Sequence, residues 1–169
     1  MNHSTHRLQA ALAATLAALL AAAAGNAWCQ QRYWYDGERK RPLWSEPATV
    51  ADFSAPAGAK SQVLKPSALA GEGKRTSPVF RDDASEKSAR RALPGGVLLR
   101  FRPGTTRESR QALLERHGLR ALREIGAGTG TWLVDAEPGI ASLELANRLY
   151  ESGDVAAASP NWWRPRALK

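Results

Sequence analysis

The clearest alternation of hydrophobic and polar positions lies between Gly95 and the C-terminus. The run GVLLRF predicts a strand, and the amphipathic stretch after RPGTT predicts a helix that Thr105 or Thr106 caps and Gly118 ends. A second helical period runs through IASLELANRLYESG and stops at Gly153. The segments LRALREIG, TWLVDA and DVAAASP predict three further strands. The order of elements is therefore β-α-β-β-α-β.

This order predicts an α+β fold of the ferredoxin-like βαββαβ type, with a four-stranded antiparallel sheet and both helices on one face. The other face of the sheet is expected to be free. The GAGTG segment at 126–130 joins two predicted strands, which favours a hairpin loop over a phosphate-binding loop. The residues expected to point toward the helices are Val97, Leu99, Phe101, Leu113, Leu143 and Leu149.

An aromatic segment at 28–44, which contains QRYWYDGERKRPLW, precedes this domain. Asp36-Gly37 is a favoured type I′ turn pair, so the segment predicts a β-hairpin. Its aromatic residues have two interpretations, either a binding patch or one hairpin face buried against the main domain. These residues are Tyr33, Trp34, Tyr35 and Trp44.

Residues 45–94 are rich in Pro, Ala, Ser and basic residues and keep no regular period. Such a composition buries little apolar surface, which predicts an extended or partly disordered linker with one short strand near Gln62–Leu64. The dibasic pairs Lys74-Arg75 and Arg90-Arg91 are either processing sites or chance pairs in a basic linker.

Residues 1–27 have the composition of a secretory signal peptide, with an apolar, Ala-rich run and small residues before Trp28. A membrane anchor is the alternative, because the run approaches the length that spans a bilayer. The signal predicts a periplasmic or secreted protein without stable membrane insertion after cleavage near Ala27. Trp28 disfavours lipidation of Cys29, and a single cysteine excludes an internal disulfide.

The charge pattern adds constraints on partners. The net charge is +8, but acidic residues alternate with basic ones even along the helices, which disfavours a nucleic-acid surface. Attraction to an acidic protein or to an anionic envelope stays open. His117 ends the first predicted helix, where capping is a better interpretation than catalysis. No metal, cofactor or catalytic motif is recognisable, so the sequence does not predict an enzyme.

The C-terminal phrases also carry a resemblance. GVLLRFRPGTT, ALLERHGLRALREI, GTWLVDAEPG and ANRLYESGDVAAASPN resemble the N-terminal prodomain of subtilisin-like serine proteases, of the inhibitor I9 or fervidolysin-prodomain type. The matching positions are Arg100 to Gly104, His117 to Leu119, Val155 and Pro160-Asn161. The resemblance covers residues 95–169, and the hairpin YWYDGERKRPL is similar to a segment that precedes such prodomains.

The resemblance implies a monomeric inhibitor or folding chaperone of a secreted subtilisin-like serine protease. Such a domain binds its protease through the free sheet face and places its C-terminal tail in the active-site cleft. No catalytic blocks follow the prodomain-like part, so the chain looks like a stand-alone propeptide. Two alternatives are a fragment of a truncated or split subtilase, and an interaction module of the cell envelope that does not bind a protease.

The tail is the site that the resemblance assigns. Trp162 and Trp163 are either anchors in the protease cleft or side chains that pack back on the domain. Pro165 is expected to stiffen the tail, and the following residues are expected to set the target protease. The predicted tail consists of Asn161, Trp162, Trp163, Arg164, Pro165, Arg166, Ala167, Leu168 and Lys169.

Overall fold

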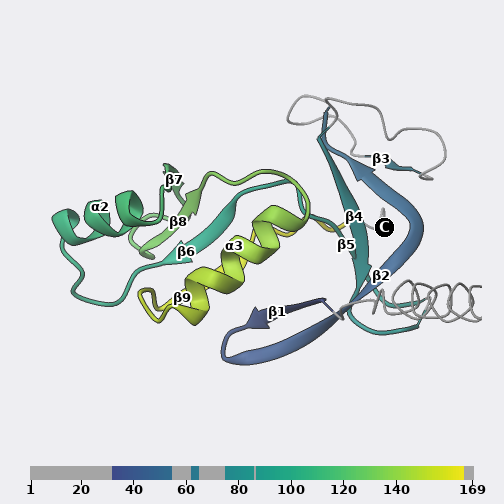
Figure 1. Ribbon diagram of the computed structural model, residues 1–169, viewed down its shortest axis with the longest axis horizontal. Coiled ribbons are helices and arrows are strands. Elements are labelled where there is room, and N and C mark those ends of the chain that lie inside the picture. Colours follow the sequence, from purple (N-terminus) through teal and green to yellow (C-terminus); the bar gives the residue numbers. More distant parts are fainter. Residues whose placement is uncertain (1–31, 55–61, 65–74, 86, 166–169) are drawn as a thin grey trace, which may run out of the picture. The chain divides into compact units, whose positions relative to one another are not determined.

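The computed structural model describes residues 32–54, 62–64, 75–85 and 87–165. The predicted signal peptide at 1–27 and Cys29 lie outside these residues. Nine strands and two helices form in the described part, and the strands belong to two antiparallel sheets (Figure 1). Their bounds are β1 Arg32–Asp36, β2 Arg39–Asp52, β3 Gln62–Leu64, β4 Thr76–Arg81, β5 Arg90–Arg91, β6 Val97–Arg100, α2 Arg107–Arg116, β7 Ala121–Glu124, β8 Thr131–Val134, α3 Ile140–Glu151 and β9 Ala157–Pro160.

The first sheet has the strand order β1-β2-β4-β5, and β3 also pairs with β2. The predicted hairpin is confirmed, because β1 and β2 meet around Asp36 and Gly37, and Gly37 has a φ of 61°. The first part of β2 pairs with β1, and its second part pairs with β3 and β4. The register of β2 against β4 shifts between Glu46 and Val50, where Pro47 has no N–H to donate to the ladder.

The structure differs from the linker expected at 45–94. Apart from β3, which was expected near Gln62–Leu64, this range supplies the second part of β2 together with β4 and β5. The reason is tertiary, because Val79 and Phe80 of β4 and Ala92 and Leu93 after β5 are fully buried. The apolar residues of this range are too few to show a period in the sequence, yet these four pack in buried clusters.

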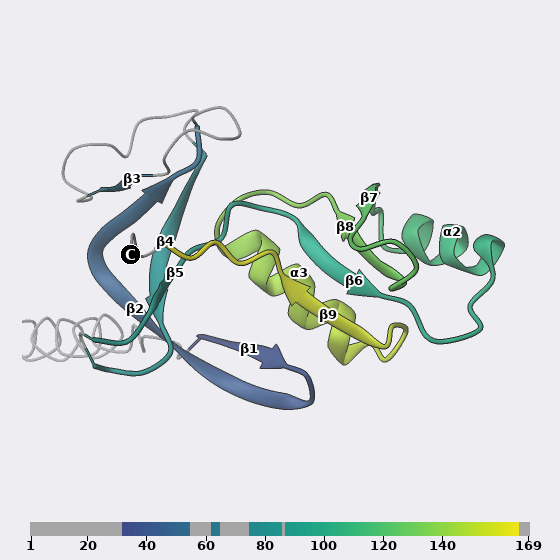
Figure 2. The same ribbon diagram turned by 180° about the vertical axis from the view of Figure 1, so that it is seen from behind.

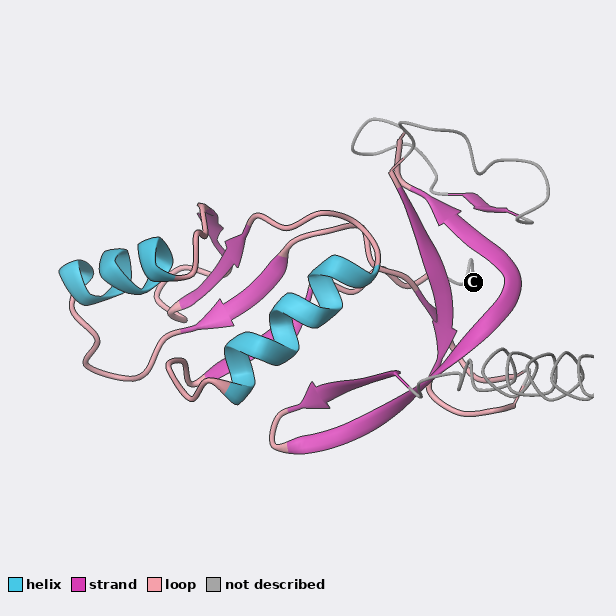
Figure 3. Cartoon of the chain, viewed as in Figure 1, coloured by secondary structure: helices cyan, strands magenta, loops and turns pink. Residues whose placement is uncertain are grey.

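The second sheet has the strand order β7-β8-β6-β9, and its elements follow along the chain as β6, α2, β7, β8, α3 and β9. Helix α3 lies across one face of this sheet. Helix α2 lies to the side of the sheet, next to the edge strand β7 (Figures 1 and 2). The predicted ferredoxin-like α+β class is therefore wrong for this protein. Strands outnumber helices, and strands of the first sheet take the place of the expected linker (Figure 3).

Local signals explain the ends of both helices. Thr106 is the N-cap of α2, where its Oγ1 accepts a hydrogen bond from the Ser109 amide at 3.2 Å. Gly118 and Gly153 follow the two helices with φ of 63° and 72°, a conformation that glycine adopts without strain. The predicted helix bounds are confirmed at these positions.

The buried side chains form three clusters. The largest lies between the second sheet and its helices, and it contains five of the six predicted core residues. Leu143, the sixth, is buried in a second cluster with Trp34, Leu43, Phe80 and Leu93, which joins α3 to the first sheet. The third cluster contains Ala51, Val79 and Ala92. Helix α3 therefore makes hydrophobic contacts with both sheets.

Glu46 links the strands of the first sheet by charge. Its carboxylate accepts hydrogen bonds from the Arg81 Nε at 2.9 Å and from Arg90, whose Nη2 lies 2.7 Å from Oε1. The hydrogen bond from Arg90 is the main cause that lowers the pKa of Glu46 below its ordinary value, while partial burial acts in the opposite direction.

Replacing Leu93 tests whether the first sheet belongs to the core. Leu93 is 0% exposed in the cluster between α3 and the first sheet, so Leu93→Ala should lower the free energy of unfolding by about 2–5 kcal/mol through the cavity that it leaves. Leu122→Ala is the control, because that side chain is 45% exposed. Equal and small losses in urea unfolding would show that Leu93 lies in a linker.

Stability should depend on the ionisation of Glu46. A carboxyl with a lowered folded pKa stabilises the protein fully above its ordinary pKa, and this contribution disappears as the pH falls through the folded value. Glu46→Gln should therefore cost about 1–2 kcal/mol in unfolding free energy at pH 7. We expect the difference from wild type to shrink toward pH 3. Glu38→Gln, at the exposed turn, is the control and should change the free energy of unfolding by less than about 0.5 kcal/mol at pH 7.

Candidate functional site

The predicted tail begins directly after β9 and is held to the segment that precedes β6. The Asn161 amide donates to the Gly96 carbonyl, and its side-chain Nδ2 donates to the Gly95 carbonyl, both at 3.1 Å. Trp163 and Ala92 exchange two backbone hydrogen bonds of 2.9 and 3.0 Å. The tail is thus paired with the chain through Trp163.

Gly95 is needed at this connection for two reasons. Its φ is 98°, and a Cβ there would lie 2.6 Å from the carbonyl oxygen of Ala136. A side chain would therefore clash with backbone as well as strain the residue. The glycine lets residues 92–96 run close against the segment after β8.

Trp162 packs back on the domain. Its ring meets the rings of Trp34 and Phe80 edge to face, with centroids 5.4 and 6.4 Å apart. It packs against the cluster that contains Leu93 and Leu143. Trp162 therefore fastens the tail to the β1–β2 hairpin and to β4.

Arg91 lies at the centre of these aromatic contacts. Its guanidinium carbon lies 4.7 Å from the ring centroid of Trp34 and 4.9 Å from that of Trp162. The side chain is only 3% exposed, and its Nη2 donates to the Asp82 carboxylate. Burial is the main cause that lowers the pKa of Arg91, and the bond to Asp82 opposes it. The cation stabilises the contact between the hairpin and the tail.

The sequence does not predict this role of Arg91, because the pair Arg90-Arg91 is expected there only as a processing site or a chance pair. No local signal separates a buried arginine from an exposed one in a basic segment. The aromatic partners lie far away in the sequence, at Trp34 and Trp162.

The rest of the tail differs in exposure. Trp163 is half-buried and meets the ring of Phe53 edge to face, with centroids 5.9 Å apart. Arg164 and Pro165 are exposed, and Arg164 lines a surface hollow together with Asp36, Arg91 and Asp82. The predicted tail residues 166–169 lie outside the described residues.

The aromatics of the hairpin bind α3. The hydroxyls of Tyr33 and Tyr35 both donate to Glu151 Oε1 at 2.9 Å, which raises the pKa of Tyr35 to about 12. Tyr35 also stacks on Tyr150 with centroids 4.2 Å apart. Trp34 is buried, so three of the four aromatics pack on the domain as the second interpretation expected. Trp44 remains 42% exposed.

The second sheet has an apolar face opposite α3. Alternation along the paired strands places Leu98 beside Leu133, and Arg100 beside Thr131, on the face that does not carry the buried Leu99. Leu98 and Leu133 are half-buried, and Arg100 is exposed. Figure 2 shows this side of β6 and β9 without a helix over it.

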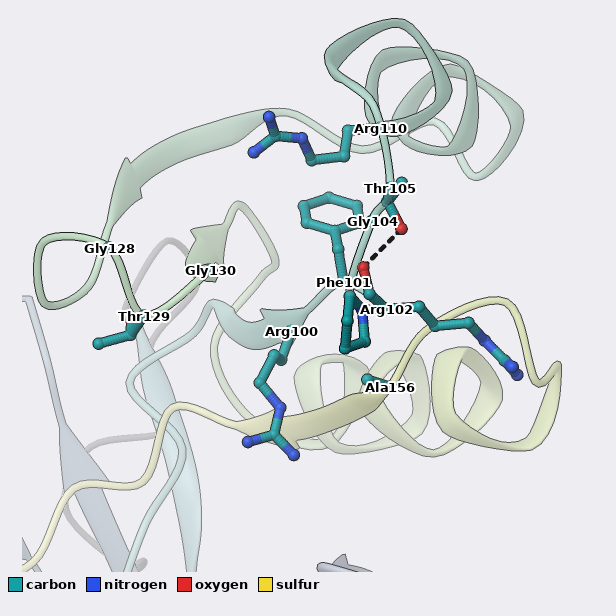
Figure 4. Close-up of a pocket in the computed structure, with 11 residues that line it drawn as sticks. Arg100, Phe101, Arg102, Gly104, Thr105, Arg110, Gly128, Thr129, Gly130 and Ala156 are labelled. Atoms are coloured by element: carbon teal, nitrogen blue, oxygen red, sulfur yellow. Dashed lines mark hydrogen bonds between the residues drawn. The ribbon is translucent and has the colours of Figure 1, made fainter.

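A basic hollow lies at the end of β6, between the turn after it and the loop from Gly128 to Gly130. Arg100, Arg102 and Arg110 line it, but their side chains extend in three different directions (Figure 4). The loop joins β7 to β8, which confirms the predicted hairpin loop. Because the guanidinium groups diverge, they do not converge on one small anion.

His117 has a structural position. It is the C-cap of α2, and its Nε2 lies 3.0 Å from the Asp154 Oδ2. The bond from His117 is the main cause that lowers the pKa of Asp154. The part of the chain that the structure describes contains no cluster of three metal-ligating side chains and no helix long and apolar enough to cross a membrane.

Comparisons with known proteins give no relative. No protein-family model, no curated protein and no solved structure matches the chain. The identification as a prodomain stays a hypothesis, and it is based on the resemblance of the sequence segments alone.

Two substitutions in the tail should separate its packed part from its exposed part. Trp162→Ala should lower the free energy of unfolding by about 3 kcal/mol, because it removes a ring from the cluster with Trp34 and Phe80. Arg164→Ala should change it by less than about 0.5 kcal/mol, since that side chain is exposed. Similar values for both in urea unfolding would mean that Trp162 does not pack on the domain.

Proposed function

We propose that the protein is an inhibitor and folding chaperone of a secreted subtilisin-like serine protease, acting on a separate protease molecule. The basis of this proposal is the resemblance of the sequence segments between Gly95 and Asn161 to the prodomains of such proteases. The segment that enters the substrate cleft begins at Arg164, because Trp162 and Trp163 hold the tail to the domain. The protein itself performs no chemistry in this function.

The observation that supports the proposal best is the change from packed to exposed side chains directly after Trp163. Up to this residue the tail is fixed by backbone hydrogen bonds and aromatic packing, and immediately after it the side chains are exposed. A segment whose preceding residues are held on the domain suits a substrate cleft. Main-chain hydrogen bonds in such a cleft give affinity, and alternate side chains give specificity. Because Asn161 and Trp163 are already held in place, the entropy cost of binding is also lower.

The open sheet face supplies a second contact in this proposal. Leu98 and Leu133 form an apolar centre, and Arg100 lies next to them. A partner surface with an apolar centre and acidic side chains at its edge fits this face.

Deleting residues 164–169 tests the proposal. The full chain should inhibit at least one member of a panel of secreted subtilases, and the deletion should weaken that inhibition at least tenfold, because the cleft-binding residues are lost. The melting temperature should change little, since the side chains of Arg164 and Pro165 are exposed. Arg120→Ala is the control, because this side chain is 75% exposed and lies outside the tail.

Two results would contradict the proposal. One is full inhibition by the shortened chain, which would exclude the cleft mechanism. The other is a lack of inhibition across the panel, combined with no gain in refolding yield of denatured subtilases when the chain is added. That outcome would favour the envelope interaction module.

A further inference from the structure

A hollow of about 340 Å³ lies between one face of α2 and the second sheet, beside the core that contains Leu113. Its lining contains three apolar side chains from the sheet side, namely Phe101, Ala121 and Trp132, but no acidic residue. The volume lies at the lower end of the range for small-ligand sites in proteins. The residues from α2 that line it are Arg107, Arg110, Gln111 and Leu114.

The four residues from α2 lie on one helix face. Their spacing of three, four and seven positions from Arg107 is the spacing that normally carries the apolar stripe of an amphipathic helix. Here only Leu114 is apolar, and just two residues of α2 are buried. The helix therefore turns a cationic stripe toward an apolar wall, and the space between them stays open.

Two nitrogen donors in this lining lack partners. The Arg110 Nε and the Trp132 Nε1 are inaccessible to solvent, yet neither has a hydrogen-bond partner. Arg110 reaches from α2 over the ring of Phe101, with its guanidinium carbon 5.9 Å from the centroid (Figure 4). A buried donor that stays unpaired is unfavourable, because it has lost its hydrogen bonds to water. Both residues line the hollow, so a small rotation of either side chain would bring its donor to an acceptor group there.

We propose that this hollow is a binding site for an aliphatic carboxylate, a fatty acid of medium chain length. The aliphatic chain lies against Phe101 and Trp132, and the carboxylate accepts hydrogen bonds from the Arg110 Nε and the Trp132 Nε1. Arg107 and Arg110 supply positive charge without an acidic competitor in the lining. A carboxylate fits because it has two acceptor oxygens for the two donors. The site is independent of the tail.

Indole N–H resonances of the full chain test the proposal directly. The protein has six tryptophans, and the signal that Trp132→Phe removes is that of Trp132. Sodium decanoate should shift this signal in a saturable manner, because its carboxylate becomes an acceptor for the indole. Decanol has the same chain without the charge and should bind at least tenfold more weakly. If decanol binds as tightly as decanoate, or if another indole signal moves in place of that of Trp132, the proposed site is wrong.

Variants test the donors separately. Arg110→Met keeps a long side chain but removes the guanidinium, and it should weaken decanoate binding about tenfold in calorimetry. Arg116→Met makes the same charge change on α2 outside the hollow, where the side chain is 66% exposed, and should leave binding unchanged. Equal effects of the two variants would reduce the interaction to general charge attraction. Binding of a peptide with an apolar C-terminal residue, but not of decanoate, would also overturn the fatty-acid assignment.

Discussion

The contact on which the rest of the structure depends is the packing of the Arg91 guanidinium against Trp34 and Trp162. The three residues come from the first hairpin, from the end of the first sheet and from the tail after the last strand. A buried cation is costly unless it is paired, and here the Asp82 carboxylate and two aromatic rings offset part of the lost hydration. Trp34 and Trp162 also contact each other, so the hairpin, β5 and the tail meet at one point.

Local signals in the sequence predict the elements between Val97 and Pro160 well. The N-cap at Thr106 and the glycines at 118 and 153 act within one or two turns, so their effect does not depend on distant residues. The fold class fails because residues 45–94 form strands only through tertiary contacts. Phe80, for example, is buried in one cluster with Trp34 and Leu93. Because these partners are not adjacent to Phe80 in the sequence, the residues next to Phe80 do not predict its burial.

The candidate site shows the same division. The sequence places the tail after the last strand, but it leaves open whether Trp162 and Trp163 bind a partner or pack on the domain. That choice depends on whether a complementary surface exists, and the surface is made by Trp34, Phe80 and Phe53. The sequence also gives no sign that Arg91 is buried, since its neighbour Arg90 is exposed and bonded to Glu46.

Under the proposed function, these aromatic contacts contribute to affinity without touching the protease. Fixing the backbone of one residue costs about 1–2 kcal/mol. The segment Asn161 to Trp163 is already fixed in the free protein by its bonds to Gly95, Gly96 and Ala92. Binding a protease therefore carries no further cost of fixing the backbone of this segment. The N-terminal hairpin would thus strengthen inhibition through Trp34, because Trp34 packs against the side chain that holds the root of the tail.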